Sequence, residues 1–183
     1  MDRRKALFLT AGVFGSALIG SELFLSGCTR KKELNLLLTE ADIHFLDEVG
    51  EVILPETERS PGARAAGIGQ FMKVIVTDCY DEKEQRIFTE GVDQINQLSK
   101  STYGAGYLEL DASQKHELLV KLDNEARQGP DTNDPHFFRM MKELTLWGYF
   151  TSEPGATQAL RYLPISGEYK GCVPYKTGDK AWF

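Results

Sequence analysis

Hydrophobic residues recur at helical spacing along most of the chain after residue 38. The first such stretch opens with Thr39-Glu40-Ala41-Asp42, in which a hydroxyl precedes a carboxylate by three positions as in a capping box. Pro55 disfavours helical backbone at the residue before it, so we expect the helix to stop at Leu54. One face of this predicted helix is apolar, with Ile43, Leu46, Val49 and Ile53.

Four more stretches have the same spacing, and each begins or ends at a recognisable signal. The predicted helices run from about Ala65 to Tyr80, from a cap at Asp81 to near Ser101, from Leu110-Asp111 to Gln128, and from His136 to Phe150. Asp134-Pro135 predicts a cap followed by proline at the first position of the last helix, which is the most apolar of the set. A short helix is expected after Pro154.

The helical pattern ends at Pro164, and the remaining residues are rich in glycine, proline and aromatic side chains. Disordered tails usually lack aromatic residues, so we expect this arm to pack on its own helices or on a partner. The chain has no stretch with convincing strand alternation and no internal repeat. The predicted fold is all-α, an irregular bundle of about five to six helices with an extended C-terminal arm.

The first 28 residues have the form of an export signal. Arg3 and Arg4 precede an apolar stretch of small residues, which ends in Leu25-Ser26-Gly27-Cys28. The paired arginines indicate twin-arginine export of a folded protein, and Cys28 is the predicted site of lipidation. The alternative is a transmembrane anchor, which needs about 20 apolar residues and would have to bury Glu22.

These signals divide the chain into a signal peptide (1–27), a lipidated tether (28–38) and one helical domain (39–183). The predicted location is the periplasm, with the lipid in the inner or outer membrane. The net charge of −6 argues against a nucleic-acid partner, so membrane attachment is assigned to the lipid on Cys28. Cys79 and Cys172 then remain, and an oxidising compartment favours a disulfide between them, the alternative being two buried thiols.

No motif in the sequence assigns a catalytic, cofactor-binding or metal-binding residue. Gly67-Ile68-Gly69 is only a fragment of a dinucleotide fingerprint, without a preceding strand or a third glycine. His44, His116 and His136 fall on three different predicted helices, and their spacing indicates no metal site. A protein of this kind works by binding, and a signal for folded export indicates that the cofactor belongs to a partner exported in the same complex.

Two blocks of sequence resemble the gluconate 2-dehydrogenase subunit 3 family. One runs from Leu146 to Tyr162 and continues through Pro164, Gly167, Tyr169, Gly171-Cys172 and Pro174-Tyr175. The other comprises Ile53 to Thr57, Pro61-Gly62-Ala63 and Gly67 to Phe71. The resemblance extends over the chain from about Leu38.

The resemblance implies a small, non-catalytic subunit that escorts, stabilises or anchors a flavoprotein. In such complexes a large subunit of the glucose-methanol-choline (GMC) class holds FAD and oxidises a sugar hydroxyl, and a cytochrome c with haem c often accepts the electrons. The substrates of similar systems are gluconate, fructose, sorbitol or the 3-hydroxyl of glycosides. Not every member of the family has a lipidated cysteine, so either a cytochrome or the lipid on Cys28 could anchor the complex.

Aromatic side chains near the C-terminus are the predicted contacts with the partner. They combine large apolar area with a polar atom, which suits them to interfaces, although some are expected to close the small domain's own core instead. The candidates are Tyr149, Phe150, Tyr162, Tyr169, Tyr175 and Trp182. Two other functions stay open from sequence: a stand-alone periplasmic lipoprotein that binds or scaffolds another molecule, and an enzyme with its site among the helices.

Overall fold

A computed structural model describes residues 38–128, 134–165, 167–168 and 170–182. Arg3, Arg4, Cys28, the tether up to residue 37, and Tyr169 lie outside the described residues. Across the described ranges the structure is helical, with two isolated bridges in place of strands, which confirms the all-α prediction. No helix in these ranges is both long enough and apolar enough to span a membrane.

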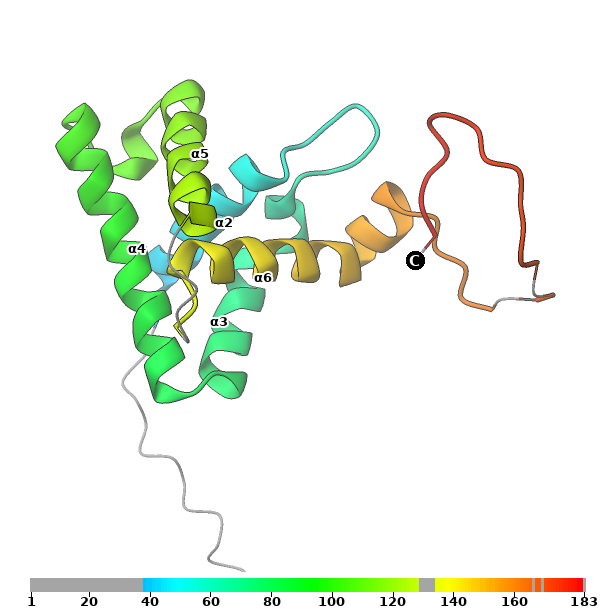
Figure 1. Ribbon diagram of the computed structural model, residues 1–183, viewed down its shortest axis with the longest axis horizontal. Helices are drawn as coiled ribbons and strands as arrows, with labels where there is room; N and C mark the ends of the chain where they lie inside the picture. Colours follow the sequence, from blue (N-terminus) through cyan, green and yellow to red (C-terminus); the bar gives the residue numbers. More distant parts are fainter. Residues whose placement is uncertain (1–37, 129–133, 166, 169, 183) are drawn as a thin grey trace, which may run out of the picture. The chain divides into compact units, whose positions relative to one another are not determined.

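The helices follow one another in the order that the hydrophobic pattern predicts (Figure 1). Two of the predicted caps are confirmed, because Thr39 with Asp42 and Asp81 with Glu84 each form a reciprocal capping box. The elements are α2 (Glu40–Ile53), the 3₁₀ helix η1 (Ala63–Ala66), α3 (Ile68–Cys79), α4 (Glu82–Tyr103), the 3₁₀ helix η2 (Tyr107–Glu109), α5 (Ala112–Gln128), α6 (Phe137–Thr151) and the π-helical turn η3 (Gly155–Ala159).

Three helix ends differ from the prediction. Helix α3 begins at Ile68 instead of Ala65, because Gly67 adopts left-handed backbone with φ 64° and separates it from η1. Helix α4 continues to Tyr103, where Gly104 provides a left-handed cap with φ 77°. The N-cap of α6 is His136 instead of Asp134, since the His136 imidazole accepts the Phe138 N–H at 3.2 Å.

Helix α6 crosses the middle of the bundle and packs against α2, α3, α4 and α5 (Figure 1). Its sequence is on average less apolar than that of α3, contrary to the prediction, but eight of its 15 residues are buried. Fully buried residues from the other helices surround it, among them Leu46, Met72, Phe88 and Ile95. Trp147 of α6 is 53 % exposed and lies edge-on to Phe71 of α3.

Candidate interaction surface

The chain from Leu54 to Gly62 forms a loop between α2 and η1 (Figure 1). At its tip the Thr57 N–H donates to the Ser60 carbonyl oxygen at 2.9 Å. The Thr57 hydroxyl in turn accepts the N–H groups of Arg59 at 3.3 Å and Ser60 at 3.1 Å. The tip is therefore a closed turn whose polar backbone groups are paired locally.

Glu51 joins the two ends of this loop. Its carboxylate accepts the Glu56 N–H at 3.0 Å and the Arg64 N–H at 2.9 Å. A Cβ on Gly62 would lie 2.2 Å from Glu51 Oε1, so the absence of a side chain there makes room for the carboxylate. The loop is held at its base, and its tip is left at the surface.

A second carboxylate on α2, Glu48, connects three elements. It accepts an ion pair from Arg64 of η1 at 2.7 Å and another from Lys115 of α5 at 3.1 Å. The Lys115 ammonium also lies 5.6 Å from the centre of the Tyr107 ring. Because both cations face the same carboxylate, Glu48 ties η1 and α5 to α2.

Tyr107 is completely buried beside that cluster, and its hydroxyl has no hydrogen-bond partner among the described side chains. Burial raises the pKa of the Tyr107 phenol, and the negative charge of Glu48 raises it further. The phenol stays protonated at any physiological pH. It contributes ring packing, including a 5.1 Å contact with Phe45.

The end of α6 is tied to the loop after α2. Tyr149 is buried, and its hydroxyl donates to the Pro61 carbonyl oxygen at 2.6 Å. Ser152 then turns the chain: its hydroxyl donates to the Tyr149 carbonyl at 2.6 Å and accepts the Gly155 N–H at 3.2 Å. A Cβ on Gly155 would lie 1.8 Å from the Tyr149 carbonyl oxygen, so this close return of the chain requires glycine.

Residues 161–182, which we call the arm, form a loop whose two ends meet (Figure 1). The Arg161 N–H donates to the Ala181 carbonyl at 2.7 Å, and the Arg161 guanidinium lies 4.7 Å from the centre of the Trp182 ring. The Lys180 ammonium donates to the Gln158 carbonyl and adds a third contact at the same place. The arm is thus closed where it leaves the helices.

Every described residue of the arm is exposed. The two most exposed large hydrophobic side chains are Ile165 at 83 % and Tyr175 at 77 %, and the others are Tyr162, Leu163, Val173 and Trp182. Single exposed apolar residues are common on proteins, but six within one short segment indicate an interaction site. The helices that the structure describes do not cover the arm, so of the two expectations for it, its own helices or a partner, we retain the partner.

The arm and the loop after α2 are neighbours. A Cβ on Gly178 would lie 3.7 Å from Nη1 of Arg59, at the tip of that loop. We call the arm together with the tip from Glu56 to Ser60 the candidate interaction surface. Its two parts come from the regions that carry the family resemblance in the sequence.

The structure divides the predicted interface aromatics into two groups. Tyr162, Tyr175 and Trp182 are exposed on the arm, as a partner contact requires. Tyr149 was wrongly assigned, because it is 3 % exposed and its hydroxyl is used inside the domain. Phe150 is half-buried and lies edge-on to Tyr149 at 5.2 Å.

Three aliphatic residues of the arm were missed from sequence, Leu163, Ile165 and Val173. The signal was present, since each of them adjoins a proline in a stretch without helical spacing. Such residues have no helix face on which to be buried.

Cys79 and Cys172 are both free and exposed, so the structure does not contain the predicted disulfide. The alternative of two buried thiols is not realised either. Cys79 is the last residue of α3 and lies off its buried face, which comprises Ile68, Gly69, Met72 and Val76. Cys172 belongs to the exposed arm.

The described residues do not offer a dinucleotide site at Gly67-Ile68-Gly69. The Gly69 N–H donates to the Asp47 carboxylate at 2.7 Å, and a Cβ on Gly69 would lie 2.2 Å from the Ile43 carbonyl oxygen. Helix α2 therefore occupies the N-terminus of α3, where a pyrophosphate would have to bind. Within the described ranges no group of three histidine, cysteine or acidic side chains is placed to hold a metal ion.

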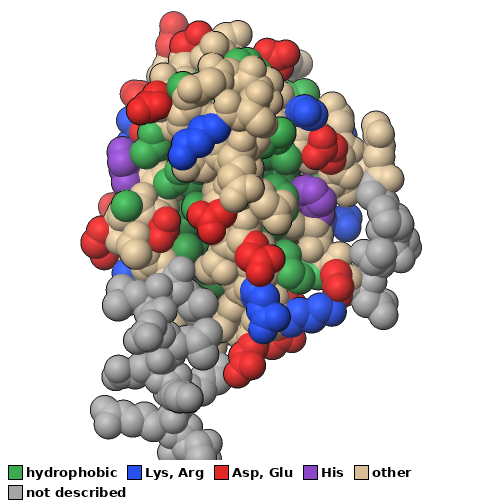
Figure 2. Space-filling model, turned by 90° about the vertical axis from the view of Figure 1, so that its left-hand side faces the viewer, with side chains coloured by type: hydrophobic (Ala, Val, Ile, Leu, Met, Phe, Trp, Pro, Cys, Tyr) green, Lys and Arg blue, Asp and Glu red, His purple; other side chains and the backbone are tan. Residues whose placement is uncertain are grey.

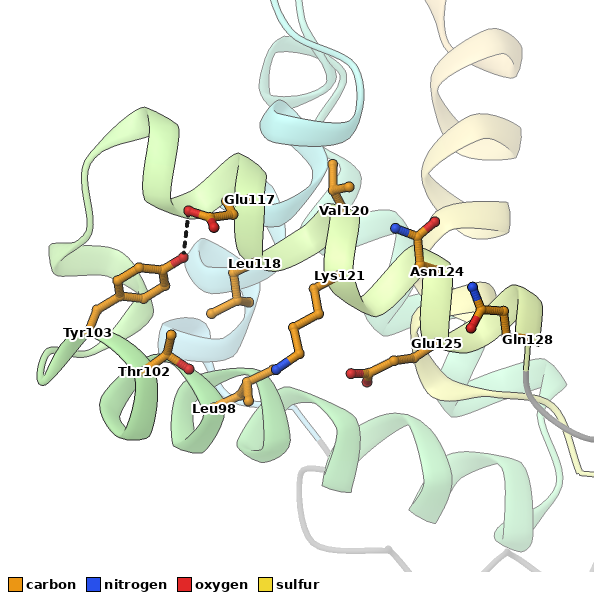
Figure 3. Close-up of a pocket in the computed structure, with 10 residues that line it drawn as sticks. All are labelled: Leu98, Thr102, Tyr103, Glu117, Leu118, Val120, Lys121, Asn124, Glu125 and Gln128. Carbon is orange, nitrogen blue, oxygen red and sulfur yellow. Dashed lines mark hydrogen bonds between the residues drawn. The ribbon is translucent and has the colours of Figure 1, made fainter.

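A groove of about 540 Å³ lies between α4 and α5 (Figure 3). The Tyr103 hydroxyl donates to the Glu117 carboxylate at 3.1 Å at one end, and Lys121 extends from α5 towards α4. Figure 2 shows the side of the molecule with these two helices, where acidic, basic and apolar side chains are interspersed. A mixed surface of this kind is typical of solvated helices and concentrates no single chemistry.

Comparison with known proteins places the chain in a family. The match is to the family described as gluconate 2-dehydrogenase subunit 3, over residues 40–167. It includes the loop after α2, all of α6 and the first residues of the arm, whereas the resemblance from Tyr169 to Tyr175 lies beyond it. No curated protein and no solved structure matches the chain. Because the matched residues span well over half of the chain, the protein is a member of the gluconate 2-dehydrogenase subunit 3 family.

Proposed function

We propose that this protein is the non-catalytic small subunit of a periplasmic, membrane-associated, FAD-dependent sugar dehydrogenase. In this proposal the large subunit is a GMC-type flavoprotein that oxidises gluconate or the 3-hydroxyl of a glycoside, and a cytochrome c with haem c receives the electrons. The small subunit assists export of the folded flavoprotein, stabilises it and anchors it. The family assignment supports the role of a subunit.

The exposed apolar arm is the observation on which the proposal depends. Leu163, Ile165 and Tyr175 are 51 %, 83 % and 77 % exposed, and full burial of an exposed large apolar side chain is favourable by about 1.5–3 kcal/mol. The hydrophobic effect therefore favours a partner on this surface. The contact between Arg161 and Trp182 already closes the arm in the free protein. Binding of a partner therefore costs less conformational entropy.

We assign FAD to the large subunit because the family assignment makes this chain the accessory subunit. In the part of the chain that the structure describes, the N-terminus of α3 at Gly67-Ile68-Gly69 is filled by Asp47 and the backbone of α2. The purified small subunit is expected to be colourless and to gain flavin absorbance only in complex with the larger chain.

Export and anchoring rest on residues of the N-terminal segment. Arg3 and Arg4 fit the signal for folded export, which suits a complex whose cofactor is loaded before transport. Lipidated Cys28 would then attach the complex to the membrane. Both roles are proposals that one fractionation experiment can separate.

The experiment compares the wild type with Arg3→Lys/Arg4→Lys, Cys28→Ala and the control Lys5→Gln in the native host. The arginine variant should leave the flavoprotein in the cytoplasm, Cys28→Ala should release an active complex into the soluble periplasm, and Lys5→Gln should behave as the wild type. An active flavoprotein that reaches the periplasm without this chain would contradict the escort role. Purification of the chain without any flavoprotein would favour the stand-alone lipoprotein instead.

A further inference from the structure

Within the arm, residues Gly171 to Tyr175 make no hydrogen bond to any described part of the chain. Figure 1 shows this part of the arm outside the helices, and after a bend at Gly171 the backbone from Cys172 to Lys176 has no helix, turn or bend. All five are exposed, and their C=O groups and the four N–H groups (Pro174 has none) have no backbone partner in the described chain. A stretch of unpaired, extended backbone is able to pair with the edge of a β-sheet.

The order of residues in this segment makes its two edges unequal. In an extended chain successive residues direct their backbone polar groups to opposite edges and their side chains to opposite faces. Val173 and Tyr175 therefore share one edge and one face. Pro174 has no N–H and interrupts the other edge, which it shares with Cys172.

We propose that Gly171 to Tyr175 binds the flavoprotein subunit as an added edge strand, through the edge that Val173 and Tyr175 share. This inference rests on the proposed function and specifies how the two subunits meet. Backbone hydrogen bonds provide the affinity, and pockets for the Val173 and Tyr175 side chains provide the specificity. The interrupted edge at Pro174 prevents a second strand from adding on the other side.

The charge of the arm indicates what flanks the sheet edge on the partner. Four basic residues, Arg161, Lys170, Lys176 and Lys180, are accompanied by two acidic ones, Glu168 and Asp179. The whole chain has a net charge of −6, so the arm is a positive segment on a negative protein. We expect carboxylates beside the docking edge, and binding that weakens as salt is added.

A lipid surface is the other partner to which the apolar and basic residues of the arm are suited. The hydrocarbon core of a membrane cannot satisfy the free backbone groups of Val173 and Tyr175, whereas a sheet edge can. This difference favours a protein partner. Vesicle binding by the arm is therefore a contrary outcome of the test.

The test measures affinity between the full chain and the flavoprotein that co-purifies with it from the native host. Val173→Pro removes an N–H from the pairing edge and should weaken binding about tenfold or more. Cys172→Pro removes an N–H from the interrupted edge and should change affinity less than about twofold. Val173→Ala keeps the backbone and should cost about fivefold through lost apolar contact.

Amide hydrogen exchange in the wild-type complex gives a readout that needs no substitution. The amides of Val173 and Tyr175 should exchange slowly in the complex, while that of Cys172 stays fast. Equal effects of Val173→Pro and Cys172→Pro, or equal exchange at the three amides, would overturn strand addition and leave the subunit role intact.

Two further outcomes separate the inference from the proposed function. Unchanged affinity after removal of residues 161–183 would overturn docking through the arm but not the existence of the complex. No binding of the wild-type chain to any flavoprotein would overturn both. Co-sedimentation of the Cys28→Ala chain, but not its arm-deleted form, with phosphatidylglycerol vesicles would assign the arm to a membrane and overturn the inference.

Discussion

The Tyr149 hydroxyl donates a 2.6 Å hydrogen bond to the carbonyl oxygen of Pro61, and the two residues are 88 positions apart in the sequence. This bond fixes the loop after α2 to the end of α6, next to the turn that leads into the arm. The two parts of the candidate interaction surface are thereby attached to the same rigid helix.

Replacement of Tyr149 by phenylalanine keeps the ring and removes the bond. The Pro61 carbonyl would lose its partner in a half-buried setting, so the free energy of unfolding should fall by about 1–2 kcal/mol. Urea unfolding measures this change. Tyr175→Phe is the matched control, because Tyr175 is exposed and its substitution should leave stability within about 0.5 kcal/mol. Equal stability of the two variants would contradict a structural role for the Tyr149 hydroxyl.

The contact between Arg161 and Trp182 should control how often the arm opens, without changing the free energy of unfolding of the helical domain. An exposed cation–π pair contributes about 0.5–1 kcal/mol, so Trp182→Ala should raise the open fraction of the arm about two- to fivefold. Trypsin cleavage after Lys170 or Lys176 would accelerate by the same factor, with no change in the global unfolding transition. Trp147→Phe, in α6, is the control and should leave the cleavage rate unchanged. Cleavage of Trp182→Ala at the wild-type rate would show that the contact does not close the arm.

Local signals explain why most of the helices were predictable. The capping boxes at Thr39 and Asp81 depend on residues three positions apart, so the sequence contains the whole interaction. Helix spacing likewise depends only on near neighbours. The boundary at Gly67 was missed because a glycine between two apolar stretches is compatible with either a continuous helix or a break.

Long-range packing explains what was not predictable. Tyr149 and Tyr175 are chemically identical, yet one is in the core and the other is on the arm, because α6 passes through the bundle and the arm does not. Trp147 lies in a helix that is apolar on several sides, and the sequence does not say which side meets α3. The closure of the arm depends on the contact between Arg161 and Trp182. The spacing of hydrophobic residues in the sequence does not predict that these two residues lie together.

Two helical glycines provide a test of packing at the centre of the bundle. A Cβ on Gly91 of α4 would lie 2.5 Å from Cδ2 and 2.6 Å from Cβ of Phe137, so Gly91→Ala should destabilise the protein by about 1–3 kcal/mol. A Cβ on Gly50 of α2 would lie 3.4 Å from Cγ2 of Ile68, which is ordinary contact. Gly50→Ala should therefore be neutral or stabilising by up to about 1 kcal/mol through helix propensity. Thermal unfolding of the two variants measures the contrast, and a loss of stability in both would contradict it.

We expect the stability of the protein to depend on pH through the protonation of His136. Its Nδ1 accepts the Phe138 N–H at 3.2 Å, which only an unprotonated nitrogen can do, and its ring stacks on Phe137 at 4.7 Å. Burial lowers the pKa of His136 below its usual 6.5, and the negative charge of Glu125 opposes this effect. Because the folded pKa lies below the unfolded one, the stabilisation is present above pH 6.5 and is lost as the pH falls through the folded pKa.

The variant His136→Asn isolates this effect, since asparagine caps a helix at any pH and does not titrate. The wild type should lose about 1 kcal/mol relative to the variant between about pH 8 and about pH 5, which is the ordinary value of an N-cap. Urea unfolding at the two pH values measures the difference. His44→Asn, at an exposed position of α2, should retain the pH dependence of the wild type. If His136→Asn retained it as well, the cap of α6 would not be the group that titrates.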